Sequence, residues 1–498
     1  MKATVSILDV SLFLIAFILL AGLFLFTAGG CAGVSTEPGK SVNPADIPNA
    51  PGENTVEPRF APNPYTDDVI QLKQRMRVPG YLPNRGMRGA EEDENGADDG
   101  SGISVTTNAP TLSTNFAGIS YTNWFPPDPI LTVGPSYVLV MVNSSLAIYN
   151  KTGGAAVKTS TLAAWFSNVS PGTDNIFDPK CAYDHWNQRY IMVVLARNEA
   201  ASQSYYLISV SQTNNPTGLW WNWKLNAKVN GSTDTNYWAD YPSLGFDSST
   251  SGAIYITTNQ FTWGDEPQFQ YSKLRILKKS ELYAGSSLHW YDFWGKKNWT
   301  GSFVFTWQPV QTMSSTTGEW LVNTVNRSSG DSVTLWKVTN PTSETPILTN
   351  VGTVFVRMYN APPDAKQKGG TQLIDTGDCR LYNAVYQNAY IYTATSEAYN
   401  WGDSTWESAI RYLKIKTSTK KAVWDKTYGS NNAYGFFPAI NVDFSSNVYL
   451  VYSRSSSTAY ASARFSGRKT TDTKMQRSAT LKAGEAYYVL KDEGGRNR

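Results

Sequence analysis

The sequence has 498 residues and a formal net charge of +3, from 43 Lys plus Arg against 40 Asp plus Glu. This near-neutral balance provides no basic face for nucleic acid. With 2 His and 3 Cys, the chain has too few ligands for a three-His zinc site, a Cys-rich metal module or a disulfide framework. Its length permits one large all-β domain.

Residues 1–30 have the pattern of an export signal. Lys2 is followed by an almost wholly apolar run, Val10 to Phe26, and then by small residues ending at Cys31. This resembles the signal of bacterial lipoproteins, although Ala28 stands where that motif usually has Leu. The resemblance implies cleavage before Cys31 and lipid on its thiol and new amino group, which anchors the chain in the membrane. An uncleaved signal anchor is the alternative.

Either form of the signal predicts export to the cell envelope. Ala32, directly after the cysteine, is of the type that permits sorting to the outer membrane in Gram-negative lipoproteins. We therefore expect a chain at the outer membrane or cell surface, attached to the membrane only through its N-terminal lipid or signal anchor.

Residues 31–110 lack a sustained helical or strand period. Proline and glycine recur, and residues 91–100 form an acidic run. Such a composition buries too little apolar surface to offset chain entropy, so we predict a disordered tether. A short helix at 71–77 that touches anionic lipid is a less favoured alternative to a solvated linker.

Residues 111–498 alternate between short apolar runs and turn-forming clusters, which predicts many strands joined by turns. Tyr137 to Val142 and Leu146 to Tyr149 are examples. Helical turns are expected only at 160–166 and 280–284.

A repeat decides the expected architecture. Each unit has an anchor, a short strand, often an Asp at a turn, and a second strand; the anchors are Pro129, Pro179, Pro242, Pro309, Cys379 and Pro438. They are separated by 50, 63, 67, 70 and 59 residues. Units of this length suggest four-stranded blades of a β-propeller. Six units are visible; the spacing favours a seventh beyond Arg498 and a C-terminally truncated domain, and six blades remain the alternative.

Four carboxylates occupy comparable positions at unit starts: Asp128, Asp178, Asp240 and Asp378. In a closed ring these positions converge at one end of the central channel, where carboxylates would raise one another's pKa and attract cations. With Tyr241 and Arg380 they form our candidate ligand-binding site, and Ca²⁺ is a possible ligand. The alternative is that each Asp only caps its own turn, as expected of Asp184, Asp247 and Asp443.

No catalytic residue is assigned. A propeller-type glycoside hydrolase or lyase would use a pair of the same channel-mouth carboxylates. Against this, no Glu stands beside an anchor, and the sialidase-type turn is absent. Nucleophile-elbow, Walker-type and dinucleotide motifs are also absent. Whether the chain is an enzyme stays open, and the sequence leans against it.

The remaining Cys and Trp residues are expected to be structural. Cys181 and Cys379 fall in units that lie across the ring, too far apart for a disulfide, so we predict two buried free thiols. The tryptophan clusters at 220–223 and 290–299 are expected to pack between blades, although exposed Trp could stack on sugars.

Several short motifs, taken together, resemble a largely uncharacterised family of exported bacterial β-propeller proteins. The resemblance spans Phe116 to Arg498 and includes Pro126-Pro127-Asp128-Pro129, Phe177-Asp178-Pro179, Asp240-Tyr241-Pro242, Asp375-Thr376-Gly377-Asp378 and Gly467-Arg468. It implies secretion and a propeller but no established reaction. We expect an envelope-anchored binding module for an extracytoplasmic protein, a surface glycan or a matrix component; a purely structural surface module is a third possibility.

Overall fold

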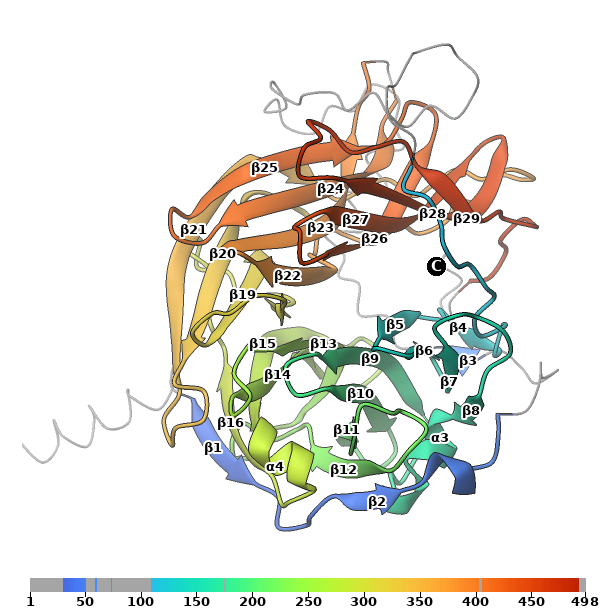
Figure 1. Cartoon of the computed structure of the whole chain (residues 1–498). Helices are drawn as coiled ribbons and strands as arrows, with labels where there is room; N and C mark the ends of the chain where they lie inside the picture. The colour runs from blue at the N-terminus through green and yellow to red at the C-terminus, as the bar shows by residue number, and fades with distance from the viewer. Residues whose placement is uncertain are drawn as a thin grey trace, which may run out of the picture.

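The computed structural model describes residues 30–50, 59–60, 73, 109–173, 175–402 and 405–491. Antiparallel β-sheets arranged as a propeller make up nearly all of this structure (Figure 1). Helices α3 (Leu162–Trp165) and α4 (Lys279–Ala284) lie at the two positions where the sequence predicts helical turns. The all-β propeller class predicted from the repeat is therefore correct.

The first three sheets follow the chain, with each strand pairing to the next. The first contains β5 (Ile130–Val133), β6 (Tyr137–Val142), β7 (Ser145–Asn150) and β8 (Lys158–Thr161). The second contains β9 (Ile176–Asp184), β10 (Arg189–Asn198), β11 (Gln203–Ser211) and β12 (Trp220–Asn226). The third contains β13 (Tyr237–Phe246), β14 (Ala253–Thr262), β15 (Phe269–Lys278) and β16 (His289–Trp294).

The second half of the chain has the same up-and-down order. One sheet contains β17 (Gln308–Pro309), β19 (Glu319–Thr324), β20 (Ser329–Thr339) and β21 (Ile347–Asn360). The next run contains β22 (Asn383–Gln387), β23 (Tyr390–Tyr399), β24 (Glu407–Lys416) and β25 (Lys421–Tyr428). The last contains β26 (Tyr434–Val442), β27 (Val448–Ser456), β28 (Ala459–Arg468) and β29 (Ala479–Lys482). A short strand, β18 (Gln311–Thr312), pairs in parallel with β13 and β22 and so links two of these sheets.

The core lies between neighbouring sheets and is rich in aromatic residues. Trp165, Trp220, Trp238 and Trp307 are fully buried. Trp165 and Trp220 meet edge to face, with ring centroids 5.3 Å apart, the geometry that aromatic quadrupoles favour. Of the tryptophans predicted to pack between sheets, Trp220, Trp223 and Trp290 are buried in the core, whereas Trp299, discussed below, is exposed.

Cys181 and Cys379 are buried and unpaired, as predicted. Cys181 lies on β9, and Cys379 lies just before β22. Burial raises the pKa of both thiols, which keeps them protonated and unreactive.

The prediction of a disordered tether over residues 31–110 is wrong for its first part. Strand β1 (Cys31–Val34) pairs with β16, and β2 (Lys40–Val42) pairs with β12. We call residues 31–42 the strap, because they add a strand to the outer edges of two sheets (Figure 1). Outer strands present unpaired N–H and C=O groups, and another segment of the chain can satisfy them.

Two further points in the predicted tether also contact the propeller. Strand β3 (Arg59–Phe60) pairs in parallel with β4 (Trp124–Phe125). Lys73 is buried and forms ion pairs with Asp364, at 3.1 Å, and with Asp375. The basic stretch at 71–77 therefore does not offer Lys73 to lipid. The acidic run at 91–100 and the signal at 1–29 lie outside the described residues. Within the part of the chain that the structure describes, no helix has the length and apolarity needed to cross a membrane.

Candidate functional site

The starts of the inner strands share an unusual backbone conformation. A positive φ recurs at the strand starts of five units: at Asp128 (42°), Asp178 (53°), Tyr241 (49°) and Phe437 (51°), each directly before its anchor proline, and at Thr306 (56°), three residues before Pro309. In four of these the next residue is proline, which disfavours helical conformations at the preceding position. Left-handed backbone costs an L-residue about 1–2 kcal/mol, and such strain concentrates at functional sites.

This strain coincides with irregular strand pairing. The pairing of β13 with β14 shifts register between Asp240 and Ser243, and that of β26 with β27 shifts between Phe436 and Ala439. Bulges of this kind turn a side chain away from the direction that the strand would give it. The local fold therefore sets the direction of side chains at the same end of several inner strands.

Asn143 connects two of the predicted carboxylate residues. Its Nδ2 donates hydrogen bonds to Asp128 Oδ2 at 2.7 Å and to the carbonyl oxygen of Pro126 at 2.8 Å. Its Oδ1 accepts a hydrogen bond from the backbone N–H of Asp178 at 2.7 Å. Asn143 is fully buried, whereas Asp128 is partly exposed. Asn143 gives no sequence signal as a site residue, because it follows β6 and lies outside the repeat template.

Asp178 lies close to two other carboxylates. Burial, followed by the nearby charges of Asp240 and Asp128, raises the pKa of Asp178 well above its usual range. Lys180 and a hydrogen bond from the backbone N–H of Tyr241 to Asp178 Oδ2, at 3.1 Å, oppose this effect without reversing it. Three of the four predicted carboxylates therefore come together, and the middle one retains its proton to higher pH than a free Asp.

Asp378 has a different role from these three. It is fully buried, and Arg380 binds both of its oxygens, with Nε to Oδ1 at 2.8 Å and Nη2 to Oδ2 at 2.7 Å. Burial alone would raise the pKa of Asp378, but the charge and hydrogen bonds of Arg380 outweigh it and lower that pKa. Asp378 therefore holds Arg380 in place and has no free oxygen for a ligand.

Arg380 and Tyr241 connect this ion pair to the carboxylates. The Arg380 guanidinium lies 4.4 Å from the ring centroid of Tyr241, and Lys180 Nζ lies 5.2 Å from the same centroid. Phe305 contacts the guanidinium groups of both Arg380 and Arg327, at 4.9 and 4.3 Å. All six predicted site residues are thus brought into one neighbourhood of carboxylates, guanidinium groups and aromatic rings.

Tyr382 and Gly377 belong to the same neighbourhood and were not proposed from the sequence. Burial, followed by the nearby groups of Asp378 and Tyr241, raises the pKa of the Tyr382 hydroxyl well above its usual value. A Cβ atom on Gly377 would lie 2.1 Å from that hydroxyl, and Gly377 has a φ of 76°. Only glycine fits this position without displacing the tyrosine.

The acids at the other end of the inner strands cap turns, as predicted. Asp184 Oδ1 accepts hydrogen bonds from the backbone N–H groups of Trp186 and Asn187 at 3.0 and 3.2 Å. Asp247 and Asp443 accept similar bonds within their own turns. Asx turns of this kind explain why Asp recurs at these positions.

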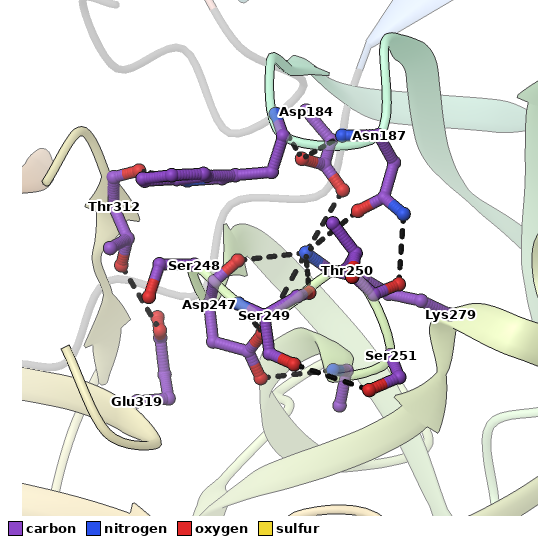
Figure 2. Close-up of polar contacts among 12 residues, drawn as sticks. Asp184, Asn187, Asp247, Ser248, Ser249, Thr250, Ser251, Lys279, Thr312 and Glu319 are labelled. Atoms are coloured by element: carbon purple, nitrogen blue, oxygen red, sulfur yellow. Dashed lines mark hydrogen bonds and ion pairs between the residues drawn. The ribbon is translucent and has the colours of Figure 1, made fainter. Parts of the chain in front are cut away.

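Two of these acids also share a buried lysine (Figure 2). Lys279 Nζ lies 3.0 Å from Asp184 Oδ2 and 3.6 Å from Asp247 Oδ1, and all three side chains are almost fully buried. It also donates hydrogen bonds to the carbonyl oxygens of Asp247 and Ser249. Glu319 is buried beside this network, and burial together with Asp247 raises its pKa well above normal. The network joins three sheets. Asp184 ends β9 and Asp247 follows β13, whereas Lys279 begins α4 directly after β15 and Glu319 begins β19.

The candidate site lacks a set of side-chain donors suited to the predicted Ca²⁺. Among the residues that the structure describes, no three His, Cys, Asp or Glu side chains gather in a way that could hold a metal ion. Asp128, Asp178 and Asp240 therefore do not fit a calcium cage, whose ligands number six to eight oxygens.

Comparison with known proteins gives fold-level similarity only. No family model matches the sequence, and no curated protein matches it. A similar solved structure is the α-L-arabinanase of Cellvibrio cellulosa complexed with arabinohexaose, at 11% identity and a TM-score of 0.31, over 68% of this chain and 90% of that one. The β-propeller domain of the Trilobed protease from Pyrococcus furiosus is similar at 10% identity and a TM-score of 0.32, over 71% and 94%. An ulvan lyase is similar at 10% identity and a TM-score of 0.29, over 75% and 72%. These low values assign no activity.

Proposed function

We propose that the chain is an envelope-tethered β-propeller that binds a polyhydroxylated ligand, of the surface-glycan type, at the site formed by Asp128, Asp178, Asp240 and Tyr241. The observation that carries this proposal is the meeting of three carboxylates from three successive inner strands beside Tyr241. Carboxylate oxygens accept hydrogen bonds from sugar hydroxyls, and a protonated Asp178 also donates one. Arg380, held by Asp378, adds fixed donors beside the tyrosine ring.

Calorimetric titration of a panel of bacterial surface glycans into the full chain tests this proposal. We expect binding to a member of the panel to weaken at least tenfold in Asp240→Asn and in Tyr241→Ala. Asp265→Asn, which changes an exposed carboxylate on another loop, is the matched control and should bind like the wild type. Equal binding by the wild type and all three variants would show that the ligand binds at another surface.

The second candidate is a glycoside hydrolase or lyase that uses the same carboxylates. The specific observation in its favour is the raised pKa of Asp178 beside Asp128 and Asp240. A carboxyl group that stays protonated next to an ionised one is the arrangement that general acid catalysis of glycosidic cleavage requires. Product release from a glycan by the wild type, lost in Asp178→Asn while binding remains, would establish the enzyme over the binder.

We also propose that this sequence forms six four-stranded blades. The runs of four consecutively paired strands support this count, as does the anchor spacing of 50 to 70 residues.

We also propose that the chain is exported and anchored in the membrane, and that it belongs to the exported propeller family that its motifs resemble. Export rests on the apolar run that ends at Phe26 and on Cys31 as the acylated residue. Membership of the exported propeller family rests on the order of its short motifs. Metabolic labelling with a radioactive fatty acid, compared between the wild type and Cys31→Ser, distinguishes a lipoprotein from an uncleaved signal anchor.

A further inference from the structure

An exposed aromatic patch lies where two neighbouring sheets meet. Trp299, Phe303 and Phe355 have exposed fractions of 56%, 43% and 67%. The rings of Trp299 and Phe355 are in contact, with centroids 6.0 Å apart, although Trp299 follows β16 and Phe355 lies on the outer strand β21. In a chain whose tryptophans are mostly packed between sheets, such clustered exposure indicates an interaction surface.

The loop that carries this patch is held in place and is basic. Lys297 forms a β-bridge with Phe303, and its Nζ lies 5.0 Å from the centroid of that ring. Trp299 Nε1 donates a hydrogen bond to Ser332 Oγ at 3.1 Å, which holds the indole in place although the residue is largely exposed. Lys296 lies over the ring of Phe293 at 5.7 Å. Aromatic rings beside lysines suit the interface between water and an anionic lipid layer.

The strap begins next to this patch. Cys31 pairs with Asp292 on β16, and the two strands are antiparallel. The chain therefore enters the propeller at the end of β16 that continues into the 296–303 loop (Figure 1). A Cβ atom on Gly30 would lie 2.8 Å from the ring of Phe293, the ring that Lys296 covers.

The length of chain before the strap sets how far this entry point can lie from a membrane. Cys31 lies five residue steps after Phe26, the end of the apolar run. Fully extended, they span about 18 Å, at roughly 3.5 Å per residue. A lipid attached to Cys31 itself would bring the entry point to the membrane surface. With either the lipid on Cys31 or the uncleaved signal anchor, the entry point lies too close to the membrane for the long stalk that the composition of residues 31–110 suggests.

We propose that Trp299, Phe303 and Phe355, with Lys296 and Lys297, form a membrane-contacting surface that rests on phospholipid headgroups. The rings enter the interfacial region, and the ammonium groups meet lipid phosphates. This places the propeller directly on the membrane with a fixed edge toward it. The inference uses the proposed N-terminal membrane attachment and is independent of the ligand proposed for the channel site.

Depth-dependent fluorescence quenching on the full chain, reconstituted into phosphatidylcholine–phosphatidylglycerol vesicles, tests this orientation. A fluorophore is placed at Thr300→Cys in the patch or at Ser445→Cys, an exposed turn of the last sheet. Cys181 and Cys379 are buried, and labelling of the unsubstituted chain gives the background from Cys31. We expect a headgroup-region spin-labelled lipid to quench the Thr300→Cys label several-fold more strongly than the Ser445→Cys label.

Two variant sets identify the groups responsible. Trp299→Ser with Phe355→Ser should remove the difference in quenching, and Lys296→Gln with Lys297→Gln should reduce it to the level seen without phosphatidylglycerol. Flotation of the vesicles reports attachment separately. A chain that floats and shows equal quenching at both positions overturns the membrane-contacting surface alone; a chain that does not float overturns the attachment and the surface together.

Discussion

Asn143 and Asp178 are joined by a hydrogen bond of 2.7 Å, from the backbone N–H of Asp178 to the side-chain oxygen of Asn143. The same amide group holds the carboxylate of Asp128. One buried asparagine at the end of β6 thus sets the relative position of two acids from adjacent sheets. The geometry of the acidic site therefore depends on an uncharged residue that is not itself one of the acids.

Replacing Asn143 by alanine should destabilise the protein by about 2–4 kcal/mol, because it removes three hydrogen bonds and leaves a backbone N–H without its acceptor. The free energy of unfolding in urea measures this loss. Asn215→Ala is the control, since the side chain of Asn215 is exposed and caps a turn on the surface. A change as small as that of the control would show that the bridge contributes little.

Replacing Asp178 by asparagine should stabilise the protein at neutral and higher pH. The folded protein raises the pKa of Asp178, so its ionisation costs stability once the pH rises above the unfolded value of about 3.9. The variant should have the higher urea midpoint at pH 8, and the two proteins should converge near pH 4. If the difference in urea midpoint between the wild type and the variant were the same at pH 4 and pH 8, the raised pKa of Asp178 would be contradicted.

Replacing Arg380 by methionine should cost about 3–5 kcal/mol at pH 7, because it leaves the carboxylate of Asp378 buried without a partner. In the wild type the lowered pKa of Asp378 gives stability that is present above about pH 4 and is lost as the pH falls through the folded pKa. In the variant this trend should reverse, with stability increasing as the carboxyl group takes up a proton.

Urea unfolding between pH 3 and 8 measures both trends. The double variant Asp378→Asn with Arg380→Met is the control, because it removes the buried charge as well as its partner. It should recover part of the lost stability at pH 7. No recovery would mean that the cost comes from lost packing of Arg380 against Tyr241 and Phe305.

Replacing Lys279 by methionine should destabilise the protein by about 3–5 kcal/mol, since Asp184 and Asp247 would stay buried without their cation (Figure 2). Lys278→Met is a matched control at the next position, where the ammonium group lies 4.0 Å from a highly exposed Glu344. Thermal unfolding compares the two. Similar midpoints for both variants would show that the buried network is not held by Lys279.

Replacing Gly33 by valine should release the strap from β16. A Cβ atom there would lie 2.4 Å from the carbonyl oxygen of Gly231 and from the ring of Trp290, and overpacking of this kind typically costs about 1–3 kcal/mol. Hydrogen exchange should speed up in β16 and stay unchanged in β14. Gly118→Ala is the control, because its Cβ would meet only Val140, at 3.9 Å.

The sequence predicted the part of the candidate site that the repeat encodes. Asp128, Asp178 and Asp240 could be aligned because each lies one or two residues before the anchor proline of its unit. The repeat did not distinguish Asp378, which has the same position but is neutralised by Arg380. Asn143 and Tyr382 gave no signal, because a single polar residue or tyrosine beside a strand is common and only the packing of neighbouring sheets brings these two to the acids.

The sequence by itself determined that the protein is built from many short strands, because alternation of apolar residues and turn formers is a local property of the chain. It also determined where Asp residues cap turns and that Cys181 and Cys379 stay apart. Only the tertiary structure decided which segments add to sheet edges. The strap strands have three or four residues and are stabilised by edges formed by residues about 180 to 260 positions away, so nothing in their own composition indicates them.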